Sequence, residues 1–220
     1  MIKKLYVWFH RLISASDEKE EYSAGFFPNL IRKKILNASQ EYSGTILEVG
    51  CGEGLYLTKL AKINSALKIY GIDNYEENLL KLKYTCDKNN IKNIHAVFGD
   101  GTNLPFKNEI FDTVFAFNLL INIDSIETVQ KIIEEMGRVC KTNGKIVFDI
   151  RNSLNPFFYF AYKLAKYYEP KADKLPFKTY KVKDIANILK KSNLIIARKI
   201  YIFPVFKAFA PIIIIEAKKP

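Results

Sequence analysis

The 220-residue sequence predicts an α/β fold in which helices cover an open, mostly parallel sheet. From Thr45 onward, short apolar runs typical of strands alternate with amphipathic helical segments. Strands linked by helices in this way pair in parallel through right-handed crossovers. The first strand runs directly into a glycine-rich loop at 50–54, the position at which such folds bind ligands. The length suits one domain with a large buried core.

The expected elements follow one another in order from this first strand. The expected strands are 45–49, 67–73, 93–100, 111–118 and 144–150, and the helices between them are 55–64, 75–89 and 125–141. Ser125 is placed as the N-cap of the last of these helices, because its hydroxyl can accept a first-turn N–H bond. Before the sheet, the apolar spacing of 28–39 predicts a helix with Pro28 in its first turn, and 3–14 predicts an interfacial helix.

The final third of the chain is expected to close the sheet differently. A helix over 181–192 is followed by two apolar runs, 194–203 and 211–219, with a short connection between them. A short connection cannot make a parallel crossover, so these two runs are expected to pair antiparallel. The four consecutive isoleucines at 212–215 indicate burial on both faces, as in a strand inserted between two others.

The spacing of the glycines discriminates between two kinds of cofactor. A dinucleotide fingerprint, G-x-G-x-x-G, places its third glycine five residues after the first. Here Gly50, Gly52 and Gly54 place it after four, and position 55 is Leu55. Glu48 precedes the loop, where its carboxylate would sit poorly beside a pyrophosphate but well beside a cation.

This loop resembles the first motif of class I S-adenosylmethionine-dependent methyltransferases (methyltransferase type 11/25-like), E/D-x-G-x-G-x-G. "GDGTNLPF", "FDTVFAFNLL" and "GRVCKTNGKIVFDI" resemble further motifs of the family in the same order, and the likeness is clear over 44–150. It implies a Rossmann-like, seven-stranded, mostly parallel sheet of order 3-2-1-4-5-7-6, with the last strand pair antiparallel and helices on both faces. It also implies an N-terminal helical cap segment at 1–43 and a methyltransferase domain at 44–220, with a lid insertion at about 151–181.

The resemblance further implies S-adenosylmethionine as the cofactor and assigns roles to residues around it. Asp73 would accept the two ribose hydroxyls, Asp100 would hold the adenine amino group, and Asn118 would lie close to the methionine part. The complete set of candidate cofactor-binding residues is Glu48, Gly50, Cys51, Gly52, Gly54, Asp73, Asn74, Asp100, Gly101 and Asn118. No metal site is predicted.

Three of these residues have an alternative, structural interpretation. Asp73 could be the N-cap of the following helix, alone or in addition to its cofactor role. Asp100, beside Gly101, suits a turn. Cys51 occupies a position where a small residue is sterically required, so no chemistry is assigned to its thiol.

No catalytic residue is assigned. Many small-molecule members of the family carry a histidine just after the fourth strand, but Asn122 stands at about that position here. Either the acceptor ionises easily, or a Tyr or Asp elsewhere acts as the base. The candidates for the acceptor pocket or its lid are Tyr22, Phe26, Asn122, Phe157 and Tyr159. For the aromatic residues, packing against the core or on the sheet edge is the alternative.

The charge of the chain is concentrated in its last third. Residues 1–150 hold 19 Lys and Arg against 19 Asp and Glu, whereas residues 151–220 hold 15 against 4, so the net charge of +11 lies there. A positive field over the candidate lid predicts an anionic acceptor or one carried on an anionic surface. Phosphorylated or carboxylated metabolites, lipid headgroups and RNA fit this charge.

Three classes of function are therefore compared. The first is a methyltransferase acting on a small, anionic or amphiphilic metabolite, with peripheral membrane contact suggested by the "KKLYVWF" start. The second is an RNA (tRNA or rRNA) methyltransferase, because a basic, aromatic-rich tail can bind phosphates and stack on bases. The third is a protein methyltransferase or a non-catalytic cofactor-binding protein. Three cysteines without a C-x-x-C pair, and no apolar run long enough to span a membrane, predict a cytoplasmic location.

Overall fold

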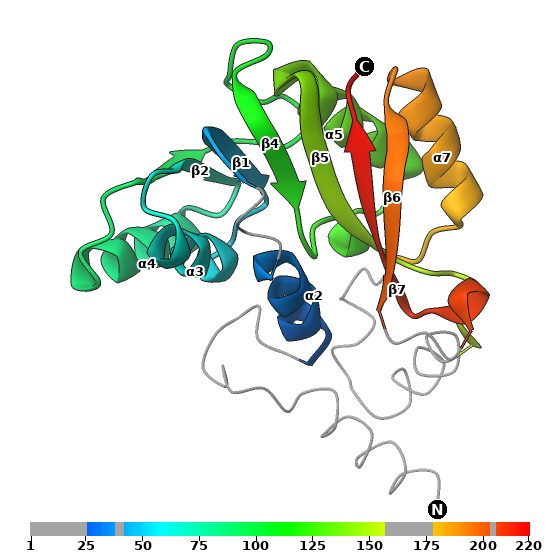
Figure 1. Ribbon diagram of the computed structural model, residues 1–220, viewed down its shortest axis with the longest axis horizontal. Helices are drawn as coiled ribbons and strands as arrows, with labels where there is room; N and C mark the ends of the chain where they lie inside the picture. Colours follow the sequence, from blue (N-terminus) through cyan, green and yellow to red (C-terminus); the bar gives the residue numbers. More distant parts are fainter. Residues whose placement is uncertain (1–25, 38–41, 157–177, 203–205) are drawn as a thin grey trace, which may run out of the picture.

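A computed structural model describes residues 26–37, 42–156, 178–202 and 206–220. A single seven-stranded sheet forms the middle layer, with helices packed against both of its faces (Figure 1). Among the described residues, no helix is long and apolar enough to cross a membrane. The predicted helix over 3–14 lies outside the described residues, as do Tyr22, Phe157 and Tyr159.

The sheet has the predicted order, β3-β2-β1-β4-β5-β7-β6. Its strands are β1 (Thr45–Val49), β2 (Lys68–Asp73), β3 (Ile94–Phe98), β4 (Phe111–Ala116), β5 (Cys140–Arg151), β6 (Ile195–Ile202) and β7 (Ile212–Lys218). β1 pairs in parallel with β2 and β4, and β7 pairs antiparallel with both β5 and β6. The carboxyl ends of β1 to β6 therefore meet at one edge of the sheet.

The helices separate into two groups, one on each face of the sheet. They are α2 (Phe26–Leu36), α3 (Leu55–Ile63), α4 (Glu76–Lys88), α5 (Ile126–Val139) and α7 (Val182–Lys191), with short 3₁₀ turns η2 (Leu120–Asn122) and η4 (Lys207–Phe209). Apolar residues of α2, α3 and α4 pack in one core cluster, and those of α5 and α7 pack in the other. The Ser125 hydroxyl accepts the Thr128 N–H at 3.0 Å, which confirms the predicted cap of α5.

The isoleucine run of β7 joins the two cores. Ile213 and Ile215 belong to the cluster under α5 and α7, whereas Ile212 and Ile214 belong to the cluster under α2 and α3. None of the four is more than 2% exposed. The prediction of an inserted strand buried on both faces is confirmed, because β7 lies between β5 and β6.

Two predicted boundaries around β5 were wrong. The strand begins at Cys140, directly after α5, rather than at 144, because Cys140 pairs with Phe111; the register then shifts within β5, so that Lys145 pairs with Thr113. It also continues to Arg151, which the sequence analysis placed in the lid insertion. The two residues pair with β4 and β7 respectively, and the ladder hydrogen bonds extend the strand at both ends.

The inserted strand should dominate the stability of the sheet. Ile214→Ala removes a fully buried side chain and is expected to lower the free energy of unfolding by about 2–5 kcal/mol. The matched control is Ile195→Ala in β6, where the side chain is 61% exposed and the cost should stay within about 0.5 kcal/mol. Urea unfolding followed by circular dichroism measures both, and equal losses would contradict the double-sided burial of β7.

Candidate cofactor-binding site

The glycine loop turns sharply from the end of β1 into α3. The N–H groups of Gly50 and Cys51 both donate to the carbonyl of Ile72, at 2.8 and 3.0 Å, which ties the loop to the end of β2. Gly50 and Gly54 have φ angles of 71° and 74°, in the left-handed region that favours glycine. A Cβ at Gly54 would also lie 2.3 Å from Leu82 Cδ1, so a larger residue does not fit there.

Asp73 joins the loop to the segment that follows β2. Its Oδ2 accepts the Gly52 N–H at 2.8 Å, and its Oδ1 accepts the Tyr75 N–H at 2.9 Å. The N-cap of α4 is Tyr75, so the interpretation of Asp73 as that cap was wrong. An ionised carboxylate has about four acceptor positions, so Oδ2 can accept a further hydrogen bond from a ligand.

Glu48 places a second carboxylate at the base of the same loop. Its side chain points to the face of the sheet covered by α2 and α3 and is 4% exposed. Its Oε2 has no hydrogen-bond partner among the described residues. Burial raises the pKa of Glu48 well above its usual range; the charge of buried Arg32 in α2 lowers it, and Asp73 raises it further. A cation bound at the loop would therefore be favoured by both Glu48 and Asp73.

The thiol of Cys51 is buried in the same loop, within the influence of both carboxylates. Burial, followed by the negative charges of Glu48 and Asp73, raises the pKa of Cys51 well above its usual value. The thiol is thus protonated at neutral pH and is not a nucleophile. This agrees with assigning no chemistry to the Cys51 thiol.

Asp100 and Gly101 lie beyond the end of β3. Asp100 Oδ1 accepts both the N–H and the hydroxyl of Thr102, at 2.7 and 2.9 Å, which confirms its part in a turn. Its side chain is exposed, as is that of Asn74 after β2. A Cβ at Gly101 would meet Val49 Cγ1 at 2.9 Å, so this turn packs against the end of β1.

Asn118 lies two residues beyond β4 and is held by a buried ion pair. Its N–H donates to Asp149 Oδ1 at 2.7 Å, and its Oδ1 accepts from Arg151 Nη2 at 2.6 Å. Arg151 Nη1 also pairs with Asp149 Oδ2, and both residues are almost fully buried. These bonds hold Asn118 at a φ of 54°, a left-handed conformation that asparagine tolerates better than most residues.

The sequence analysis did not identify Asp149 and Arg151. A usable signal was present, because an acid and a base two positions apart at a strand end lie on the same face of the sheet. Placing Arg151 in the lid insertion separated it from Asp149 and hid this relationship.

Asn122 and the loop after β4 are fixed by further hydrogen bonds. Asn122 Nδ2 donates to the Asn118 carbonyl at 2.9 Å, and the Asn122 side chain is exposed. The Tyr180 hydroxyl donates to the carbonyl of Leu120 at 2.8 Å and lies 3.1 Å from that of Ile123. Burial, with a contribution from Asp124, raises the pKa of Tyr180 to about 12, so this phenol is not a base at neutral pH. Tyr180 was also missed from sequence, since it lies far along the chain from the loop that it holds.

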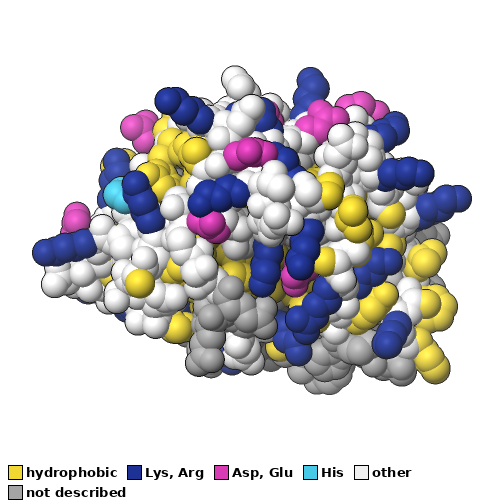
Figure 2. Space-filling view, turned by 45° about the horizontal axis from the view of Figure 1, so that its top comes forward, with side chains coloured by type: hydrophobic (Ala, Val, Ile, Leu, Met, Phe, Trp, Pro, Cys, Tyr) yellow, Lys and Arg dark blue, Asp and Glu magenta, His cyan; other side chains and the backbone are white. Residues whose placement is uncertain are grey.

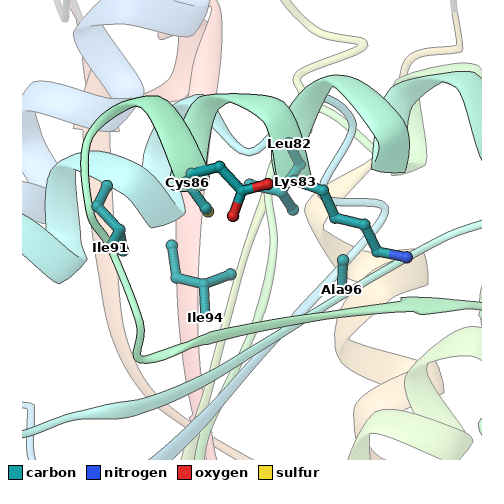
Figure 3. Close-up of a pocket in the computed structure, with 7 residues that line it drawn as sticks. Leu82, Lys83, Cys86, Ile91, Ile94 and Ala96 are labelled. Carbon is teal, nitrogen blue, oxygen red and sulfur yellow. The ribbon is translucent and has the colours of Figure 1, made fainter.

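The site residues therefore gather at the carboxyl ends of β1 to β5. The glycine loop, Asp73 and Glu48 surround the end of β1, and Leu119 brings the loop after β4 against Gly50, where a Cβ would lie 2.7 Å from Leu119 Cδ1. A separate cavity of about 210 Å³ lies between α4 and β3 (Figure 3). Cavities that hold a cofactor of this kind are larger, about 300–1,000 Å³, and that cavity contains neither the glycine loop nor Asp73.

The comparison with protein families agrees with this geometry. The profile of the methyltransferase domain family matches residues 41–194, which is more than half of the chain. The chain belongs to this family of methyltransferase domains. The match includes the glycine loop, Asp73, Asp100, Asn118 and the ion pair of Asp149 with Arg151.

Relatives of this chain act on different kinds of acceptor. It is 32% identical over 139 residues to the demethylmenaquinone methyltransferase of Staphylococcus saprophyticus, covering 60% of this chain and 56% of the relative. It is 27% identical over 128 residues to the phosphatidylethanolamine N-methyltransferase of Cereibacter sphaeroides, covering 58% and 60%. It is 37% identical over 119 residues to a tRNA (guanine-N(7)-)-methyltransferase of Metamycoplasma hominis, covering 47% and 58%. The chain thus spans a little over half the length of each.

Among solved structures, the chain resembles magnesium protoporphyrin IX methyltransferase from Synechocystis PCC 6803, solved with bound SAH. The TM-score is 0.68 at 17% identity, and the match covers 88% of this chain and 82% of the other. At this identity the likeness establishes the fold, which is that of the class I S-adenosylmethionine-dependent methyltransferases.

The raised pKa of Glu48 predicts how stability depends on pH. Because the folded-state pKa lies above the unfolded value of about 4.3, the folded state binds more protons between the two values. The stabilisation from this group is complete below the unfolded pKa and is lost as pH rises through the folded pKa. Glu48→Gln should therefore gain stability relative to the wild type as pH rises from acid to weakly alkaline values.

Urea unfolding at a series of pH values, without added cofactor, measures this difference. The control is Glu134→Gln on the exposed face of α5, which should follow the wild-type pH dependence. Parallel stability curves for Glu48→Gln and the wild type would show that Glu48 does not titrate differently in the folded state.

Proposed function

We propose that this protein transfers the methyl group of S-adenosylmethionine to a small, amphiphilic or anionic acceptor. The observation that carries the proposal is the pair of buried carboxylates, Glu48 and Asp73, at the glycine loop. Glu48 Oε2 lacks a partner among the described residues, as expected of a group that receives a cationic ligand. A pyrophosphate would meet the Asp73 carboxylate and would leave the buried Glu48 carboxyl without a cationic partner, which disfavours a dinucleotide.

The residues present fit S-adenosylmethionine at this edge of the sheet. Asp73 Oδ2, which accepts the Gly52 N–H, would accept the ribose hydroxyls, and Glu48 would balance the positive charge of the ligand. Free N–H groups in the first turn of α3 add a favourable site for the carboxylate of the ligand. Asp100, Asn74, Gly101 and Asn118 are proposed to complete the site by resemblance to the family.

The cofactor, when bound, supplies an already activated methyl group on a sulfonium. The protein then chiefly has to align the acceptor and exclude water. The loop 117–123 is built for alignment, since Asp149, Arg151 and Tyr180 hold its backbone and Asn118. Asn122 contributes a neutral amide, which cannot serve as a general base, so the acceptor should ionise easily or bring its own activation.

The nature of the acceptor rests on the relatives and on charge. Demethylmenaquinone and phosphatidylethanolamine are the acceptors named for two relatives, and both combine a polar group with long apolar chains. An anionic or amphiphilic acceptor also agrees with the excess of basic residues after residue 150. Together these favour an acceptor that has a charged or polar head and an apolar body.

A second candidate function is methylation of RNA. The similarity to a tRNA methyltransferase favours it, as does the basic last third of the chain. A labelled methyl group transferred from S-adenosylmethionine into fractionated cell extract separates the two. We expect the label in the fraction that contains small molecules and lipids. Label that enters RNA and is released by ribonuclease would instead establish the second candidate, and label in protein would exclude both.

The cofactor proposal predicts a large effect of Asp73. Each charge-assisted hydrogen bond lost is worth about 1.5–3 kcal/mol, so Asp73→Ala should weaken S-adenosylhomocysteine binding at least about tenfold. Asp73→Asn, which keeps the shape of the side chain but removes its charge, should also weaken S-adenosylhomocysteine binding. Isothermal titration calorimetry measures both, with Asp87→Ala on the exposed side of α4 as the matched control.

Two outcomes would contradict the proposal. Wild-type protein that binds NAD more tightly than S-adenosylhomocysteine would refute the choice of cofactor. Unchanged affinity in both Asp73 variants, with thermal unfolding showing them folded, would reduce Asp73 to a support for the Gly52 and Tyr75 N–H groups.

A further inference from the structure

Three large apolar side chains stand in solvent at one corner of the carboxyl edge. Leu154 is 55% exposed, Phe206 is 68% exposed and Phe209 is 51% exposed. Leu154 follows β5, whereas Phe206 and Phe209 lie at η4, between β6 and β7. We call these three residues the apolar tip. Exposed phenylalanines held near one another are unusual in a protein that acts alone in water, and they mark an interaction site.

The apolar tip is rigidly presented. Asn152, which is 1% exposed, donates from Nδ2 to the carbonyls of Ala208 and Ala210 at 2.9 and 3.0 Å. Its Oδ1 accepts the Leu154 N–H at 3.1 Å, so one buried side chain joins both parts of the tip. Asn155 adds a bond from Nδ2 to the Phe209 carbonyl. These hydrogen bonds hold the backbone on both sides of the tip in place.

Basic residues surround the apolar tip. Lys207 lies within it and is exposed, and Lys181 and Lys183 are exposed where α7 begins at the same edge, because Tyr180 pairs with Asn152 beyond β5. Lys178 also lies there, 3.8 Å from Asp124. Figure 2 shows hydrophobic side chains among Lys and Arg side chains at the right-hand end of the molecule, where Figure 1 places α7 and η4.

The apolar tip is linked to the candidate site through neighbouring residues at the end of β5. Arg151, the last residue of β5, holds Asn118 on one side, and Asn152 holds the tip on the other. Apolar side chains surrounded by lysines match an interface between acyl chains and anionic headgroups. A protein partner with an acidic rim would need a matching apolar socket, whereas a bilayer meets both requirements without one.

We propose that Leu154, Phe206 and Phe209, with the surrounding lysines, dock this edge of the protein onto an anionic phospholipid membrane. The apolar tip enters the headgroup region while Lys207, Lys181 and Lys183 contact lipid phosphates. If the proposed function holds, an amphiphilic acceptor reaches the site from the bilayer. The docking itself does not require methyl transfer, so the two proposals fail independently.

Sedimentation of the full chain with lipid vesicles tests this surface. Wild-type protein should bind vesicles of phosphatidylcholine and phosphatidylglycerol, and bind pure phosphatidylcholine more weakly. The double substitution Phe206→Ser and Phe209→Ser should lower the partition constant at least about tenfold through lost apolar contact. Lys207→Glu should lower it about tenfold on the anionic vesicles alone.

A matched control uses exposed apolar residues elsewhere. Leu80 and Tyr84 on α4 are 57% and 67% exposed, so Leu80→Ser with Tyr84→Ser removes comparable apolar surface far from the tip. Vesicle binding of this control should equal that of the wild type. Equal losses in the control and the tip variants, or no binding by the wild type, would overturn the proposal.

Other occupants of the surface give distinct results. A dimer in sedimentation equilibrium that the Phe206 and Phe209 substitutions dissolve would assign the tip to self-association and overturn the proposal. Binding of bulk tRNA that Lys207→Glu weakens, with no vesicle binding, would assign the surface to nucleic acid and overturn it. S-adenosylhomocysteine affinity, measured on the same samples, should be equal in all variants. Wild-type protein that binds vesicles but does not bind S-adenosylhomocysteine would refute only the proposed function.

Discussion

The site depends on the attachment of the glycine loop to the end of β2. Two loop N–H groups share the Ile72 carbonyl, and Asp73 receives a third from Gly52. These bonds hold a backbone with repeated positive φ angles, which only glycine adopts at little cost. The same attachment sets Glu48 beneath the loop and directs the start of α3 toward the ligand. Without it, neither the carboxylates nor the free N–H groups of α3 would have a defined position.

Much of the fold could be predicted because its causes are local and periodic. The alternation of strands and helices gave the parallel sheet, and the short link between 203 and 211 gave the antiparallel pairing of β6 with β7. The boundaries of β5 could not be predicted in this way. Cys140 and Arg151 extend that strand because β4 and β7 provide residues for them to pair with. The spacing of apolar residues along one strand does not show which residues of other strands will pair with it.

The residues around the glycine loop were more predictable than the contacts that hold the loop after β4, for a similar reason. Asp73, Glu48 and the glycines are close in sequence to strand ends that a motif identifies. The loop after β4 is held by contacts over long separations: Tyr180 donates to the Leu120 carbonyl, and Arg151 donates to Asn118. Replacing both partners of a buried ion pair by apolar residues is often neutral or stabilising, so such a pair is weak evidence for stability. We infer that the pair of Asp149 with Arg151 serves to fix the geometry of Asn118.

The place of β7 in the sheet has a consequence for how the protein is made. The strand that completes both β5 and β6 is the last of the seven to leave the ribosome. Until residues 212–218 emerge, the nascent chain carries an unpaired edge on β5 and a strand β6 that has no neighbour. The four consecutive isoleucines pair with β6 through a short connection, but their contacts with β5 are distant in sequence and carry a high ordering cost. Until those contacts form, the chain exposes an apolar, incomplete sheet with an unpaired edge, a condition that favours aggregation over folding.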